Sequence, residues 1–190
     1  MQDFIDQAAK NGVALLDTGI CQFCGADYQR GIYECIENYN NGLLYFDFSD
    51  IDNHLYRFLS VDAHALQHPE IHGRWSNHFH LTRLHLILEK KQPWDYNKSP
   101  LLSEHLNRYK SNKPNEFLKA PESLNRGNIT AKDLTKATTA EECAQLITKW
   151  ADEVYQSWSS NHAVISQIAD GFIENYYNEI KQERITMKRK

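Results

Sequence analysis

The sequence predicts an all-α protein, folded as a single-domain helical bundle over residues 1–190. Three observations predict this class. Apolar residues recur at intervals of three and four along most of the chain, which is typical of amphipathic helices. No alternating strand pattern of useful length is present. A chain of 190 residues with 41% hydrophobic composition suits one domain with one core.

The N-terminal half is predicted to contain three helices and a loop. Each segment is defined by apolar positions on one helical face, or by the glycines and prolines that interrupt it. Residues 3–16 form a short helix, and residues 19–31, which include three glycines, form a loop. Helices at 32–46 and 51–68 follow. The second must end before Pro69, because the proline ring disfavours helical geometry in the preceding residue.

The C-terminal half is predicted to begin with an irregular segment and to end in helices. Residues 92–129 hold four of the five prolines, and we expect one short helix there, opened by a Ser-Pro dipeptide. Capping signals start two of the later helices, at Thr130-x-x-Asp133 and at Thr139-x-x-Glu142. The helices predicted outside the irregular segment span residues 76–91, 130–137, 139–158 and about 161–181.

Charge and hydropathy argue against several classes of protein. The net charge of −4 and the pI of about 6.1 provide no electrostatic basis for binding nucleic acid. No run approaches the ~18 apolar residues that would span a bilayer, so we expect no membrane association. The first six residues lack the basic start and the apolar stretch of a signal peptide. We therefore expect a cytoplasmic protein.

The most informative motif is Cys21-Gln-Phe-Cys24-Gly25, followed by a third cysteine at Cys35. Two thiols two residues apart can bind one tetrahedral zinc ion, and the glycine lets the backbone fold tightly around it. This cysteine loop (residues 21–35) is therefore predicted to be zinc-knuckle-like, to lack one ligand and to pack on the bundle. Two alternatives stay open: buried thiols that act as small hydrophobic residues, and a redox-active cysteine pair.

Hairpin geometry indicates where the fourth ligand lies. The two helices that follow the first cysteines are joined by a short turn, so they must lie antiparallel. This arrangement places Cys35 opposite about Asp62 and brings the end of the second helix beside the cysteine loop. His64 and His68 lie at that end, whereas His54 lies about 15 Å away along the axis. The predicted metal ligands are therefore Cys21, Cys24 and Cys35, with His64 or His68 as the fourth.

Four other residues are candidates to support these ligands or to form a second site: Asp62, His64, His80 and His162. Asp62 lies on the apolar side of its helix, where an unpaired carboxylate is costly. It must pair with the second nitrogen of a metal-ligating histidine or with an arginine. His80 belongs to the same end of the bundle, because the third long helix starts there. His162 either caps the last helix or reaches the metal pole. The arginine candidates are Arg57, Arg74 and Arg83.

With these residues in view, the chain resembles an uncharacterised bacterial family of unknown function. The resemblance rests on four blocks between residue 21 and about residue 170. They are Cys21-x-x-Cys24-Gly25-Ala26, Val61-Asp62-Ala63-x-x-x-Gln67-His68-Pro69, His80-Leu81 and Trp150-x7-Trp158-x3-His162. The resemblance implies that the functional positions are Asp62, His68, His80 and His162. The chain departs from the family pattern in having His64 in place of an aromatic residue and in lacking a histidine near Arg57.

Two classes of function fit this pattern, and zinc is the expected cofactor in both. Under the first hypothesis the metal is structural, because three thiolates and one imidazole form a closed shell. Function would then lie in binding a protein partner or a second copy of the chain. Under the second, the chain is a metal-dependent hydrolase or thiol transferase in which His68, His80 and His162 hold an open metal site. That arrangement resembles the metal-dependent thiol transferases of the DNA-damage-inducible bundle group. A thiol redox protein is a third alternative.

Overall fold

The structure is a computed structural model that describes residues 2–187. Within that range it contains eight α-helices and no strand, apart from one isolated bridge between Gly19 and Arg30. The predicted all-α class is therefore confirmed. The helices are α1 (Gln2–Lys10), α2 (Gly31–Gly42), α3 (His54–Gln67), α4 (Arg74–Leu88), α5 (Lys98–Asn112), α6 (Ala131–Leu134), α7 (Ala140–Ser157) and α8 (His162–Met187).

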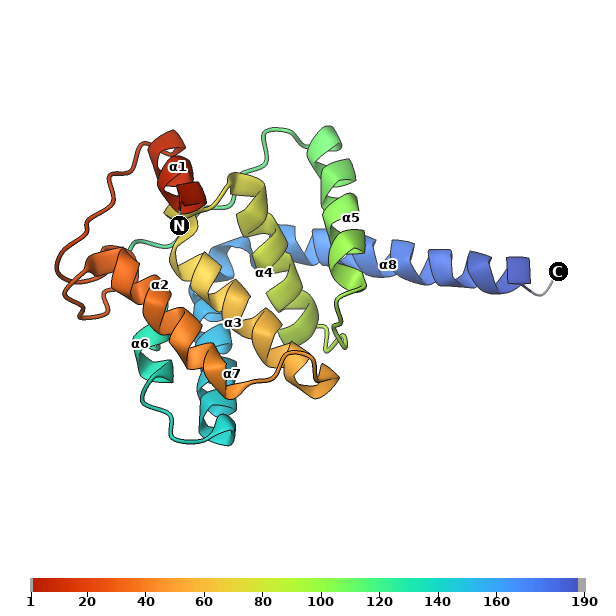
Figure 1. The fold of residues 1–190 in the computed structure, drawn as a ribbon. Helices are drawn as coiled ribbons and strands as arrows, with labels where there is room; N and C mark the ends of the chain where they lie inside the picture. Colours follow the sequence, from red (N-terminus) through yellow and green to blue (C-terminus); the bar gives the residue numbers. More distant parts are fainter. Residues whose placement is uncertain (1, 188–190) are drawn as a thin grey trace.

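Helix α3 lies at the centre of the bundle (Figure 1). It packs against α7 and α4, and α4 in turn packs against α5 and α8. Helix α2 packs against α6, and its side chains meet those of α3 across an antiparallel pair. The largest side chains of the core are fully buried between these helices, and they include Trp150, Trp158, Leu66, Leu81 and Ile147. The two tryptophans therefore serve the core, as large rings on one helical stripe usually do.

Several helix ends follow the predicted signals. Helix α3 ends at Gln67, before Pro69, and the proline opens a short 3-10 turn. Thr139 caps α7 by accepting a hydrogen bond from the backbone N–H of Glu142 at 3.1 Å. Thr130 forms a capping box at the start of α6, where the Asp133 carboxylate accepts from the Thr130 N–H at 2.8 Å.

Two N-terminal boundaries differ from prediction. Helix α1 ends at Lys10 rather than at residue 16, because Gly12 takes a left-handed conformation with φ +72° and closes the helix. Helix α2 ends at Gly42, and 3-10 turns and a loop occupy residues 43–53. The connection between α2 and α3 is therefore longer than the predicted turn. This length shifts which residues of the two helices face each other.

The segment predicted to be irregular, residues 92–129, contains the whole of α5. The predicted short helix is thus 15 residues long. It is held by Leu102 and Leu106, which lie one turn apart and are buried against the bundle. Packing of this apolar pair against α4 and α8 extends the helix beyond what its polar sequence favours.

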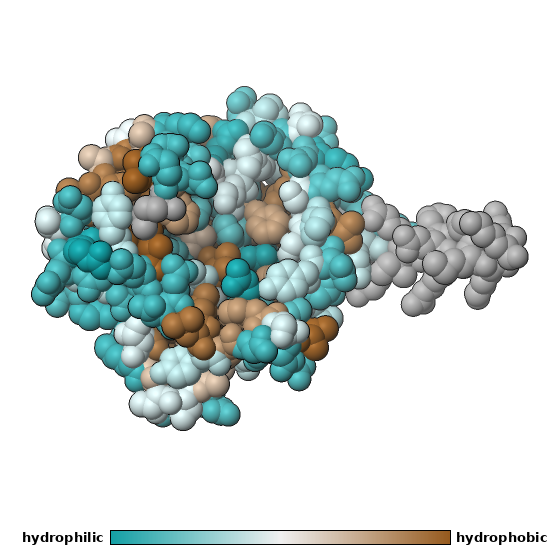
Figure 2. Space-filling view, viewed as in Figure 1, coloured by the Kyte–Doolittle hydropathy of each residue, from teal (hydrophilic) through white to brown (hydrophobic). Residues whose placement is uncertain are grey.

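The surface mixes polar and apolar residues on the face shown in Figure 2. The most exposed large apolar side chains are Leu44, at 81%, and Ile51, at 70%, both in the connection between α2 and α3. None of the helices in the described part of the chain combines the length and apolar character needed to cross a bilayer.

Candidate metal centre

Four side chains from separate parts of the sequence meet at one end of α3. They are Cys21, Cys24, Cys35 and His68, and we call them the Cys3His cluster. Their ligand atoms, three sulfurs and one imidazole nitrogen, all lie within 4.8 Å of one another. The structure thus brings together the three predicted cysteines and His68, one of the two histidines predicted as the fourth ligand. Such a buried group could hold a metal ion.

Three of the separations within the Cys3His cluster match those of a tetrahedral metal site. His68 Nε2 lies 3.5 Å from Cys21 Sγ and 3.4 Å from Cys35 Sγ, and Cys24 Sγ lies 3.8 Å from Cys35 Sγ. An ion with metal–sulfur bonds of about 2.3 Å and a metal–nitrogen bond of about 2.0 Å sets tetrahedral edges of about 3.8 Å and about 3.5 Å. A disulfide would need sulfurs about 2 Å apart, and all three cysteines are free thiols.

The first two cysteines lie in a tight turn. The Cys21 N–H donates to the Ala26 carbonyl at 2.9 Å, and the Gly25 N–H donates to the Cys21 carbonyl at 2.8 Å. Gly25 has φ +77°, a left-handed conformation that L-residues with side chains rarely adopt. The glycine after the second cysteine therefore lets the chain curl back, so that both sulfurs face the same point.

The base of the cysteine loop is closed just before α2. The Gly19 N–H donates to the Gln29 carbonyl at 2.9 Å, and the Gly31 N–H donates to the Gly19 carbonyl at 3.0 Å. Gly31 has φ +52°, and a Cβ at this position would lie 2.3 Å from the Leu16 carbonyl oxygen. This close backbone approach joins the loop to α2, and it places Cys35 one turn into the helix.

His68 is oriented by the end of α3. Its Nδ1–H donates to the His64 carbonyl at 2.6 Å, which leaves the Nε2 lone pair directed at the thiols. The Phe23 ring meets the imidazole edge-on, with centroids 5.9 Å apart. Both interactions hold the ring in place. His68, Cys21 and Cys35 are fully buried, and Cys24 is 7% exposed, so the cluster is shielded from solvent.

The pKa values of the residues in the Cys3His cluster are consistent with a site for a cation. Burial alone would lower the pKa of His68, but hydrogen bonds with Cys21 and Cys24 outweigh it and raise that pKa to about 10. Hydrogen bonds with Cys24 and Cys35 hold the pKa of Cys21 well below its usual value. Contact with Cys21 and Cys24 raises the pKa of Cys35. Without a metal ion, Cys21 therefore ionises more readily than Cys35. A divalent cation would stabilise all three thiols as thiolates.

Asp62 occupies a separate buried network. Its carboxylate accepts two hydrogen bonds from Arg83, Nε–Oδ2 at 2.8 Å and Nη2–Oδ1 at 2.6 Å. It also accepts one from His80 Nδ1 at 2.7 Å. Both predicted kinds of partner, a histidine nitrogen and an arginine, are present at once. The Arg83 guanidinium lies 4.9 Å from the ring centroids of Phe58 and Phe79, which shield the ion pair from water.

The predicted register between α2 and α3 is wrong. Cys35 faces His68 rather than Asp62, and Tyr39 faces His64 with ring centroids 4.5 Å apart. The long connection at residues 43–53 moves α3 relative to α2, so each residue of α2 meets a later position of α3 than the predicted turn allows. His64 lies between Tyr39 and His68, with its ring 4.3 Å from that of His68. It supports the His68 ring and does not replace it in the cluster.

The other predicted histidines lie elsewhere. His80 pairs with Asp62, and His162 is the first residue of α8, where its ring stacks on Tyr155 at 4.1 Å. Of the two alternatives for His162, the one in which it reaches the metal pole is not realised, because its ring lies outside the Cys3His cluster. Among the described residues, only the Cys3His cluster brings three or more ligand atoms within 4.8 Å. The three-histidine arrangement of the enzyme hypothesis, with His68, His80 and His162 around one ion, is thus not assembled.

One supporting contact was not predicted from sequence. Leu124 N–H donates to the Phe23 carbonyl at 3.0 Å, so the segment before α6 holds the cysteine turn. Buried Arg126 fixes this segment by donating to the Gln67 carbonyl at 3.0 Å and to Glu70 at 2.6 Å. No local pattern marks the role of Arg126, because Gln67 and Glu70 lie more than 50 residues away in the sequence.

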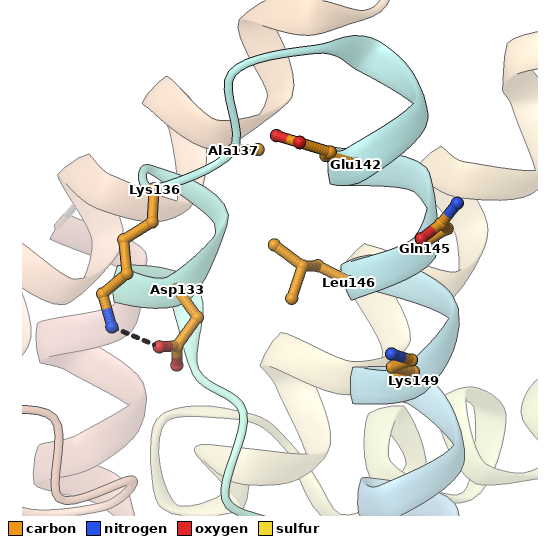
Figure 3. A pocket seen from close by; sticks show the side chains of 7 residues that line it. All are labelled: Asp133, Lys136, Ala137, Glu142, Gln145, Leu146 and Lys149. Atoms are coloured by element: carbon orange, nitrogen blue, oxygen red, sulfur yellow. Dashed lines mark hydrogen bonds and ion pairs between the residues drawn. The ribbon is translucent and has the colours of Figure 1, made fainter.

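A surface pocket between α6 and α7 has a different character (Figure 3). Its volume is about 310 Å³, and Leu146 and Ala137 provide its apolar lining. Three of the charged residues around it have local partners: Lys136 pairs with Asp133 at 2.7 Å, and Glu142 accepts from the Thr138 N–H at 2.8 Å. The pocket includes no member of the Cys3His cluster.

Comparison with known proteins gives a family but no activity. A family described as a family of unknown function (DUF5946) matches residues 19–159, a range that includes the whole Cys3His cluster and leaves out His162. No curated protein and no solved structure matches the chain. Because the match spans most of the sequence, the chain belongs to the family of unknown function DUF5946.

Proposed function

We propose that this protein binds one zinc ion in the Cys3His cluster, and that the ion is structural. The observation that carries the proposal is the closed, buried tetrahedron of three sulfurs and one imidazole nitrogen. Structural zinc sites have four protein ligands of this type, whereas catalytic sites keep a position open for water. Four donors at tetrahedral separations leave no such position.

The donor set selects zinc over the other common cations. Calcium and magnesium prefer oxygen ligands, and the Cys3His cluster offers none. Thiolate and imidazole ligands in a tetrahedron suit zinc, which has no geometric preference of its own from d-electrons. The Nδ1–H bond from His68 to the His64 carbonyl adds the kind of support that metal-ligating histidines usually have.

The ion would join three parts of the chain that few other contacts hold together. Cys21 and Cys24 lie in the turn, Cys35 lies on α2, and His68 follows α3. Zinc binding in small structural sites contributes about 10–16 kcal/mol at neutral pH, enough to order an irregular loop. The metal would thus fix the cysteine loop to the bundle.

The biological role would then lie in binding, with a protein partner or a second copy of the chain as the partner class. Such a partner would cover Leu44 and Ile51, which are 81% and 70% exposed in the connection between α2 and α3. Three reduced thiols require a reducing compartment, which supports the cytoplasm as the location.

Metal content measured on purified protein tests the proposal. We expect one zinc per chain by elemental analysis in the wild type. The Cys21→Ser/Cys24→Ser double variant should contain none and should unfold at a much lower urea concentration. Cys143→Ser is the matched control, because Cys143 is equally buried, lies outside the cluster and bonds only the Gly42 carbonyl at 3.3 Å. It should keep the zinc.

Two results would contradict the proposal. Metal retained by the double cysteine variant would place the ion on other ligands. Wild-type protein that contains no metal, and that gains no thermal stability when zinc is added, would leave the cysteines as plain thiols.

A further inference from the structure

A polar hollow lies where α4 ends and α7 gives way to α8. Its volume is about 330 Å³. It is lined by His85, Glu89, Lys90, Tyr155, Gln156, His162 and Ser166. None of these residues belongs to the Cys3His cluster or to the Asp62 network, so the hollow is a separate site.

His85 brings an unpartnered nitrogen to this hollow. The residue is only 3% exposed, and its buried Nε2 makes no hydrogen bond among the described residues. Its other nitrogen, Nδ1, lies 2.8 Å from the Tyr155 hydroxyl. When Nδ1 carries the proton and donates to that oxygen, Nε2 offers its lone pair. A buried polar atom without a partner is uncommon in proteins and points to a ligand.

His162 offers a second lone pair from α8. Its Nε2–H donates to the Tyr155 carbonyl at 3.0 Å, and a carbonyl can only accept, so this bond fixes the tautomer. Nδ1 is then unprotonated. The imidazole also stacks on the Tyr155 ring, with centroids 4.1 Å apart and planes 13° apart, which holds its orientation.

The third candidate ligand at this hollow is a carboxylate. Glu89 follows His85 by four residues and directly follows the last residue of α4; its N–H still donates to the His85 carbonyl at 3.0 Å, so it continues the helical face of His85. The nearby ammonium of Lys90 is already paired with Asp170 at 2.7 Å, so its positive charge is offset and does not oppose a cation in the hollow.

We propose that His85, His162 and Glu89 form a second site, open to solvent, for a divalent transition-metal ion. Two imidazoles and one carboxylate are a common donor set for such ions, with further positions left for water or another ligand. The ring centroids of His85 and His162 are 6.3 Å apart, whereas a tetrahedral ion would bring them to about 5 Å. The His85 and His162 rings therefore move about 1 Å closer together when the ion binds. The site forms around the ion, unlike the pre-assembled Cys3His cluster.

Cobalt(II) titration of protein that carries one zinc per chain tests this site by itself, because the closed Cys3His cluster takes the first ion and the open second site is left for cobalt. Zinc keeps the thiols occupied, so cobalt in the second site should give weak visible absorption and no sulfur-to-cobalt charge-transfer band. We expect one cobalt per chain in the wild type, and at least tenfold weaker binding in Glu89→Gln and in His162→Ala. Glu104→Gln is the matched control, since Glu104 is an exposed carboxylate on α5 that pairs only with Arg108 at 3.8 Å. It should bind cobalt as the wild type does.

Glu89→Gln keeps the proposal testable if a histidine variant fails to fold, because Glu89 lies at the edge of the hollow and not in the core. The proposal is overturned if zinc-loaded wild-type protein binds no cobalt, or if Glu89→Gln and His162→Ala both bind it with unchanged affinity. A charge-transfer band would also overturn it, by showing that cobalt had displaced zinc from the thiols. Each result is independent of whether the Cys3His cluster is structural.

Discussion

At the scale of single residues, histidine orientation decides what the two buried networks can do. The His68 Nδ1–H donates to a backbone carbonyl, so Nε2 is left for the thiols. The His80 Nδ1 is held instead by the Asp62 carboxylate, which Arg83 grips through two hydrogen bonds. His68 is thus a candidate metal ligand, whereas His80 is a partner in a buried ion pair.

Replacing Asp62 with asparagine should destabilise the fold without removing the metal. The change leaves the Arg83 guanidinium buried without its counter-charge, and breaking a buried ion pair in this way costs about 3–5 kcal/mol. Urea unfolding of the zinc-loaded variant would measure the loss, and elemental analysis should still find one zinc per chain. Glu104→Gln removes an exposed carboxylate and should change stability by less than about 0.5 kcal/mol. A loss of zinc in Asp62→Asn would show that the two networks are coupled.

At the scale of elements, the joint between the cysteine loop and α2 sets the distance from the first two cysteines to the third. Gly31 lies at this joint with a left-handed backbone, against the Leu16 carbonyl. The N–H of the same residue donates to Gly19, which closes the base of the loop. The position of Cys35 relative to Cys21 and Cys24 therefore depends on this contact.

Gly31→Ala should both destabilise the protein and weaken zinc binding. A Cβ would clash with a backbone oxygen at 2.3 Å and would also be strained at φ +52°, so we expect a cost of about 3 kcal/mol or more. Gly12→Ala is the control. It has a similar φ of +72° but open space around its Cβ, and it should cost about 1 kcal/mol. Competition with a zinc chelator and urea unfolding measure the two effects. Equal behaviour of the two variants would contradict the role given to Gly31.

At the scale of the whole molecule, the Cys3His cluster connects segments that lie up to 47 residues apart, from Cys21 to His68. The remaining contacts of the cysteine loop include backbone hydrogen bonds, the hydrogen bonds of Gln22 with the Ala14 carbonyl and the Leu16 N–H, and the packing of Phe23 and Tyr28. Metal binding and global stability should therefore change together.

Acid should release the metal and destabilise the protein in the same pH range. Zinc binds thiolates and neutral imidazole, whereas without the ion the pKa of His68 is raised to about 10 and that of Cys35 is raised above its usual value, so zinc must displace protons at both positions. Protons compete more strongly as the pH falls, so affinity should decrease by more than about tenfold per pH unit below neutrality. Zinc released to a coloured indicator and thermal melting, both followed from pH 8 to pH 4, would report this. When thermal melting is repeated with excess chelator, the metal-dependent part of the stability change should be absent. Zinc still bound at pH 4 with unchanged melting would contradict the prediction.

Local signals predicted a large part of the fold. Helix α3 ends before Pro69, and the threonine caps start α6 and α7, because these effects act within one turn of the chain. The length of α5 was underestimated, since only packing against α4 and α8 supports it. Cys21, Cys24 and Cys35 were recognisable as candidates because ligand spacing is itself a local property.

The sequence by itself determined the helical class, several helix ends and the three cysteines of the Cys3His cluster, because periodicity, capping and ligand spacing are short-range. Only the tertiary structure decided that Cys35 faces His68 and not Asp62, since that register depends on the whole connection between α2 and α3. It also decided that Asp62 pairs with Arg83 and His80 together, and that His85 and His162 share a hollow. These contacts join residues distant in sequence, and long-range packing rather than local pattern brings them together.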